Sequence, residues 1–151
     1  MARVSTRVEK VITVNSGLEQ TFKLLSDLKE APKYVPGLEK SETIDDVTFH
    51  WTFEPVGFKG INITVSYTVK YTVDAPDKVS WETVAGSGNA ESTGAFMLKK
   101  VDDNTTEINL KMEVTVEAPI PRLLTKMAKP FLNTEAVKLI DGYLENLKNA
   151  L

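Results

Sequence analysis

Four hydroxyl-bearing side chains fall on the apolar face of strands that the sequence predicts, and they are the best candidates for chemistry. Along their strands, Tyr67, Tyr71, Thr83 and Ser92 are in phase with aliphatic and aromatic residues. A few hydrogen-bonding groups among apolar side chains are the usual composition of a small-molecule site. In an enzymatic alternative, Tyr67 or Tyr71 would polarise a carbonyl group of a substrate. In the other alternative these side chains only fill a dry core.

The remaining chemical groups are placed poorly for catalysis or metal binding. His50 is the only histidine, and its position between two aromatic residues predicts that it faces solvent, opposite to Ser92. This geometry argues against a Ser–His–Asp arrangement. Because the chain has no cysteine and no second histidine, we expect no metal site. Most carboxylates fall at outward positions or in turns, so we predict no catalytic residues and no cofactor; the facing of Glu42 and Glu91 stays open.

Two segments could act at the surface. Gly57-Phe58-Lys59-Gly60 is typical of a hairpin tip, where Phe58 could gate a cavity or contact a membrane or a partner; an ordinary hairpin is the alternative. Arg122, Lys126 and Lys129 accompany apolar residues at helical spacing, which would allow a weak contact with anionic lipid or with a protein. A solvated helix face explains the same pattern.

Composition limits the class of protein. A chain of 151 residues is expected to form a single domain, residues 1–151, and 42% hydrophobic with 26% charged residues is ordinary for a globular protein. The net charge of −3 argues against nucleic-acid binding, which normally needs a clustered basic face. No stretch reaches the ~20 apolar residues of a membrane span, and the first residues lack a signal-peptide pattern. We therefore expect a cytoplasmic protein with no integral membrane segment.

Alternating hydrophobicity defines the elements that position the candidate residues. From Ile61 to Val73 every odd residue is apolar or aromatic and every even residue is polar, which predicts one long strand over 61–74. Turn-forming residues separate further strands and favour short hairpin connections. The expected antiparallel meander has seven strands, at residues 4–14, 38–44, 47–54, 61–74, 79–83, 90–101 and 105–117.

Helical spacing occurs near both ends of the chain. Ser16 followed by Glu19 predicts a capping box at the start of a helix over 18–28. A second short helix is expected to follow, with Pro32 in its first turn, and to end at Pro36.

The C-terminal region has the longest helical stripe. Pro130 lies inside it and lacks a backbone donor, so we expect a kink or two helices, at about 121–128 and 131–149.

The order of these elements resembles the helix-grip fold of the START/SRPBCC superfamily. The resemblance is greatest to polyketide cyclase/dehydrase proteins and to the G-type subunits of carbon monoxide dehydrogenase, and the chain is also similar to coenzyme Q-binding proteins. It implies an α+β fold, with a curved seven-stranded antiparallel sheet around a long C-terminal helix and two short helices between strands 1 and 2. The segments that carry it are Val11-Ile12-Thr13-Val14-Asn15, Leu25-Ser26-Asp27, Tyr34-Val35-Pro36-Gly37-Leu38 and Phe131 to Leu147.

The resemblance also implies a deep cavity between the sheet and the closing helix. We expect it to bind or transport a hydrophobic small molecule, such as a lipid, a quinone or a polyketide-like compound. A cyclase or dehydratase, or a protein-interaction or recruitment module, is the alternative. The expected ligand-binding residues face this cavity: Tyr34, Phe49, Trp51, Val65, Tyr67, Val69, Tyr71, Trp81, Thr83, Ser92, Phe96, Leu110, Met112, Met127 and Phe131.

Overall fold

Seven strands form one antiparallel sheet in the computed structural model, which describes residues 2–151. The strands are β1 (Ala2–Val14), β2 (Leu38–Thr43), β3 (Thr48–Phe53), β6 (Ser66–Asp74), β7 (Lys78–Thr83), β8 (Ala90–Asp102) and β9 (Thr105–Ala118). Their spatial order is β1-β9-β8-β7-β6-β3-β2, so the first strand pairs with the last.

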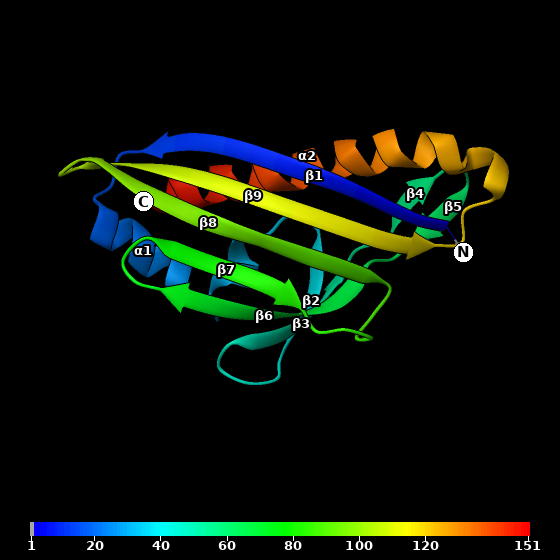
Figure 1. Cartoon of the computed structure of the whole chain (residues 1–151), viewed down its shortest axis with the longest axis horizontal. Helices are drawn as coiled ribbons and strands as arrows, with labels where there is room; N and C mark the ends of the chain where they lie inside the picture. The colour runs from blue at the N-terminus through cyan, green and yellow to red at the C-terminus, as the bar shows by residue number, and fades with distance from the viewer. Residues whose placement is uncertain (1) are drawn as a thin grey trace.

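Helices cover one face of the sheet and close its ends. The helical elements are α1 (Leu18–Ser26), the single 3-10 turns η1 (Ala31–Tyr34) and η2 (Arg122–Leu124), and α2 (Thr125–Ala150). Figure 1 shows α2 running along the sheet behind β1 and β9, with α1 at one end of the molecule. At the other end lies a separate two-stranded hairpin of β4 (Val56–Phe58) and β5 (Ile61–Ile63). This arrangement confirms the predicted helix-grip α+β fold.

An aromatic band crosses the inner face of the sheet and reaches α2. Cross-strand register places Trp51 opposite Tyr67 and Tyr71 opposite Trp81. Ring centroids along the band are about 6 Å apart, within the range of favourable edge and tilted contacts. The contacts are Phe53–Tyr67 (5.9 Å), Trp51–Tyr71 (6.3 Å), Tyr71–Trp81 (6.1 Å), Trp81–Phe96 (5.7 Å) and Phe96–Tyr143 (5.6 Å).

Polar side chains fix the position of α2 over the sheet. On the inner face of β1, the predicted intrusion of Lys10 is explained by its partner on the helix. Since this ion pair is partly exposed, it contributes little stability and serves mainly to orient the helix. The contacts are Asn133 Nδ2 to Thr6 Oγ1 (2.8 Å), Lys10 Nζ to Asp141 Oδ1 (3.5 Å) and Asn146 Nδ2 to the Tyr34 carbonyl (2.9 Å).

The single strand predicted over 61–74 is wrong, because the chain leaves the sheet at Thr64 and Val65. Residues 61–63 pair with β4, whereas 66–74 pair with β3 and β7. The Asn89 side chain satisfies the backbone at the break: its amide donates to the Thr64 carbonyl (2.7 Å) and accepts from the Ser66 N–H (2.9 Å). Alternation persists across the break, since it reports which way side chains face and not which strand the backbone pairs with.

The predicted capping box at Ser16 and Glu19 is also wrong. Gly17 is the N-cap of α1, and no described side chain caps the helix. Ser16 is buried instead, and its carbonyl accepts a hydrogen bond from Thr106 Oγ1 at 2.7 Å. The second predicted helix is only the 3-10 turn η1, which does contain Pro32 at its start.

Pro130 does not split the C-terminal helix, which was predicted as two segments. The helix α2 is continuous from Thr125 to Ala150, with Pro130 inside it. The N–H that proline lacks would have bonded the carbonyl of Lys126, an exposed residue whose carbonyl water can reach. The helix therefore tolerates the proline at this position.

Gly94 lets the Trp81 indole lie against β8. The two residues are opposite one another in the sheet, and a Cβ added to Gly94 would collide with the Trp81 ring and the Lys111 carbonyl. We expect Gly94→Ala to lower the free energy of unfolding by about 1–3 kcal/mol, the usual cost of overpacking. Denaturant titration monitored by circular dichroism measures this loss.

Gly57→Ala is the matched control, because nothing lies within 4 Å of a Cβ at Gly57. Its stability should stay within about 0.5 kcal/mol of the unsubstituted protein. Equal stability of the two variants would contradict the close approach of Trp81 and Gly94.

Candidate ligand-binding cavity

A cavity of about 340 Å³ lies between α2 and the inner face of the sheet. Its lining is mainly apolar and comes from β3, β6, β9, α2 and the chain before β2. The charged members, Glu54, Glu135 and Lys138, are exposed or partly exposed and mark its mouth, where Lys138 Nζ lies 3.5 Å from Glu135 Oε1. The full lining is Pro36, Gly37, Phe53, Glu54, Val56, Val65, Tyr67, Met112, Val114, Val116, Leu132, Glu135, Ala136, Lys138 and Leu139.

A smaller inner cavity of about 30 Å³ continues from the main cavity into the aromatic band. The two share Phe53, Tyr67, Met112 and Leu139 as walls. The inner cavity is large enough for a single water molecule or one polar atom of a ligand. Its other walls are Val35, Trp51, Val69, Tyr71, Trp81, Ser92, Phe96, Ile140 and Tyr143.

A side pocket of about 80 Å³ extends the main cavity toward the β4–β5 hairpin. Both are lined by Val56, Val65 and Leu132. Phe131 lines the side pocket and packs against Phe58, with ring centroids 4.8 Å apart. Phe58 is buried, so the hairpin tip presents a wall of this end of the molecule and no exposed aromatic contact.

Most predicted site residues come together around these three spaces. Val65, Tyr67 and Met112 line the main cavity, and Phe131 lines the side pocket. The inner cavity collects the rest: Trp51, Val69, Tyr71, Trp81, Ser92 and Phe96, again with Tyr67 and Met112.

Five predicted residues line none of the three spaces. Phe49 and Leu110 are fully enclosed core residues, and Thr83 bonds the backbone of Ser92. Tyr34 lies in η1 beside α2. The expectation that Met127 closes the cavity is wrong: its residue is 42% exposed, because the neighbouring Ala128 takes the inward position of that helical turn.

The sequence analysis missed much of the helix side and the loops. Val114 and Val116 continue the alternation of Met112 and could have been included on that signal. Tyr143 follows Ile140 by three residues on the inward helical stripe. Residues from irregular segments carry no periodic signal: Pro36, Gly37 and Glu54.

Buried hydroxyls form the polar part of the inner cavity. The Trp81 indole N–H donates to Ser92 Oγ at 3.0 Å. Burial raises the pKa of Tyr67 well above its usual value, and a hydrogen bond with Ser92 offsets part of that rise. Burial likewise raises the pKa of Tyr71 and of Tyr143, and neighbouring tyrosines add to both rises. The three phenols therefore remain neutral and can donate hydrogen bonds.

The other candidate groups lie away from these spaces. His50 is on the opposite face of the sheet, with Nδ1 2.9 Å from Thr68 Oγ1. Within residues 2–151 no group of three or more histidine, aspartate or glutamate side chains is arranged to hold a metal ion. In that part of the chain, no helix is long and apolar enough to span a membrane.

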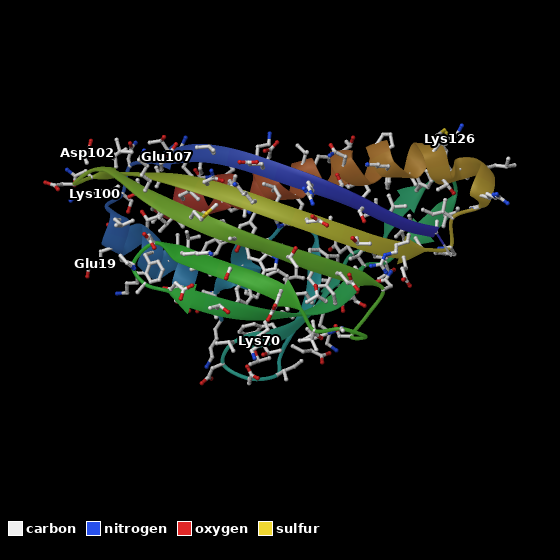
Figure 2. All side chains as sticks on the ribbon, in the orientation of Figure 1. Glu19, Lys70, Lys100, Asp102, Glu107 and Lys126 are labelled. Atoms are coloured by element: carbon white, nitrogen blue, oxygen red, sulfur yellow. The ribbon has the colours of Figure 1, made fainter. Side chains whose placement is uncertain are left out.

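The basic segment at the start of α2 is exposed. Lys126 projects outward near the β4–β5 end of the molecule, as Figure 2 shows. Next to it Leu123 is 93% exposed. Contact of this segment with anionic lipid or a protein stays a prediction.

Comparisons with known proteins agree with the fold and the cavity. Residues 5–151 match a family described as polyketide cyclase/dehydrase and lipid transport. An uncharacterised 17.2 kDa protein of Streptomyces lincolnensis is 26% identical over 109 residues, which cover 72% of this chain and 68% of that protein.

Two solved structures share the fold. A START superfamily protein of Mycobacterium smegmatis is 14% identical, with a TM-score of 0.70 and 95% of each chain covered. The Zhui aromatase/cyclase of a Streptomyces species is 13% identical, with a TM-score of 0.70, 97% of this chain and 93% of that chain covered. The predicted START/SRPBCC assignment is confirmed.

The buried phenols predict resistance to alkaline ionisation. Because the pKa of Tyr67, Tyr71 and Tyr143 is raised in the folded protein, their contribution to stability is complete below their unfolded value of about 10. It is lost as the pH rises above that value. We expect these tyrosines to ionise only as the protein unfolds, which ultraviolet absorbance of tyrosinate and circular dichroism measure together. Full tyrosinate absorbance in a folded protein would contradict this burial.

Proposed function

The chain belongs to the polyketide cyclase/dehydrase and lipid transport family, and from that membership we propose that it binds or carries a hydrophobic small molecule beneath α2. The proposed ligand is a lipid, a quinone or a polyketide-like ring compound. Hydrophobic ligand binding is the general property that the family supports; the choice among these ligands is our proposal.

The observation that carries the proposal is the apolar cavity of about 340 Å³. This volume lies at the lower end of the range of small-molecule sites, about 300–1,000 Å³. Its aliphatic and aromatic walls favour a ligand with a large apolar body, because burying such a body releases about 25 cal/mol per Å² of apolar surface. The charged residues stand at its mouth, where a polar end of the ligand or water meets them.

An enzymatic role has weaker support from the geometry. A neutral Tyr67 hydroxyl could polarise a carbonyl, as a cyclase or dehydratase requires. The described walls of the inner cavity, however, hold no carboxylate, histidine or lysine to accept a proton. Glu54 and Glu135 lie at the mouth of the main cavity instead. Binding is therefore the function that this site supports best.

Native mass spectrometry of protein purified gently from its own cells tests the proposal. We expect a retained small molecule, which denaturing extraction releases and identifies. An empty protein that also fails to take up any lipid, quinone or aromatic compound from a panel would contradict a carrier role.

Filling the cavity should weaken binding without disturbing the sheet. Val65 borders the main cavity and the side pocket, in the irregular segment between β5 and β6. We expect Val65→Trp to weaken binding of the extracted ligand at least about tenfold, the equivalent of two methylene groups excluded from the cavity. Isothermal titration calorimetry measures the change.

Val101→Trp is the matched control, since Val101 is an exposed residue on β8 and far in register from the cavity walls. Its affinity should equal that of the unsubstituted protein. If both variants bound equally well, the ligand would have to lie outside the cavity.

A further inference from the structure

Tyr67 stands where the main cavity meets the inner cavity. It lines both spaces, together with Phe53, Met112 and Leu139. A ligand whose body fills the main cavity therefore presents one end to the Tyr67 side chain and to the inner cavity behind it.

A chain of hydrogen bonds leaves the Tyr67 proton free. The Trp81 N–H donates to Ser92 Oγ at 3.0 Å, so the Ser92 hydroxyl can give its own proton to Tyr67. The Ser92 backbone is held in place by Thr83, whose hydroxyl accepts from the Ser92 N–H and donates to the Ser92 carbonyl at 2.8 Å. Since Tyr67 accepts in this chain, its own O–H remains available as a donor, and the chain polarises it further.

A second donor borders the same cavity. Trp51 is opposite Tyr67 in the sheet, and its Nε1 is buried with no hydrogen-bond partner among residues 2–151. An unsatisfied buried donor costs roughly 1–3 kcal/mol, so an acceptor supplied by a ligand or a water molecule would remove this cost.

Charge narrows the chemical class of that acceptor. None of the described residues that line the inner cavity carries a charge. A carboxylate or phosphate would lose its hydration there without a cation to replace it, which is costly. An uncharged oxygen acceptor loses much less and fits the about 30 Å³ available.

We propose that the inner cavity is a subsite for the carbonyl oxygen of an uncharged ligand, a ketone or a quinone, which accepts hydrogen bonds from Tyr67 Oη and Trp51 Nε1. The apolar body of the same ligand occupies the main cavity. This inference rests on the proposed function and specifies the ligand class and its orientation.

A matched pair of ligands separates this subsite from general apolar binding. The pair is methyl naphthyl ketone and isopropenylnaphthalene, in which a methylene group replaces the carbonyl oxygen. Calorimetry gives the ratio of their affinities for the unsubstituted protein and for Tyr67→Phe. We expect the ratio in favour of the ketone to fall about fivefold in Tyr67→Phe, the loss of one ordinary hydrogen bond. An unchanged ratio would overturn the subsite, while binding of both compounds would leave the proposed function intact.

An infrared measurement on the unsubstituted protein gives a test that needs no variant. The carbonyl stretch of the isotope-labelled ketone should move to lower frequency on binding than in an apolar solvent. Ser92→Ala should reduce the shift by weakening the support of Tyr67, whereas Ser80→Ala, on the opposite face of β7, should not. A bound carbonyl with its apolar-solvent frequency would overturn the subsite, and failure of the protein to bind either compound would count against the proposed function as well.

Discussion

A single helix must cover an apolar sheet face that is much wider than itself. Six inter-strand spacings of about 4.8 Å would make seven flat strands nearly 30 Å wide, whereas a helix with its side chains is about 10–12 Å across. The sheet therefore has to curve around α2, and side chains have to fill what remains. They do so unevenly along the helix: Ile140, Tyr143, Leu144 and Leu147 fill one half, while Ala128 and Ala136 leave space in the other. The cavity is thus a result of side-chain size along one helix, within a fold that forces a gap.

The aromatic band determines how deep that space extends. Trp81 can lie against β8 only because Gly94 has no side chain, and from there its indole reaches Ser92. Packing and polarity are coupled at this point, since the glycine that admits the ring also places the hydrogen bond that supports Tyr67. The polar groups stay neutral because burial disfavours their ionised forms. A site built in this way distinguishes ligands by where they carry an oxygen more than by their charge.

Side-chain alternation and helical spacing were enough to predict the α+β helix-grip architecture and the inward residues of the central strands. They were not enough where distant contacts decide the outcome. The break between β5 and β6 depends on the Asn89 side chain from another loop, and the continuity of α2 through Pro130 depends on the exposure of Lys126. Met127 was assigned inward because helical stripes include neighbours about one turn apart, while the three-dimensional packing selects Ala128. The cavity walls from the segment around Pro36 carry no period at all, so no pattern could have identified them.

The β4–β5 hairpin makes its backbone hydrogen bonds within itself, and it contributes Val56 and Ile63 to the apolar walls. Its main anchor to the helix is the contact between Phe58 and Phe131. Changes in the length or sequence of this short insert therefore need not alter the register of the seven main strands. In evolution, and equally in protein engineering, the hairpin offers an exchangeable module through which the capacity of the cavity can be enlarged or reduced while the inner, hydroxyl-lined end remains as it is.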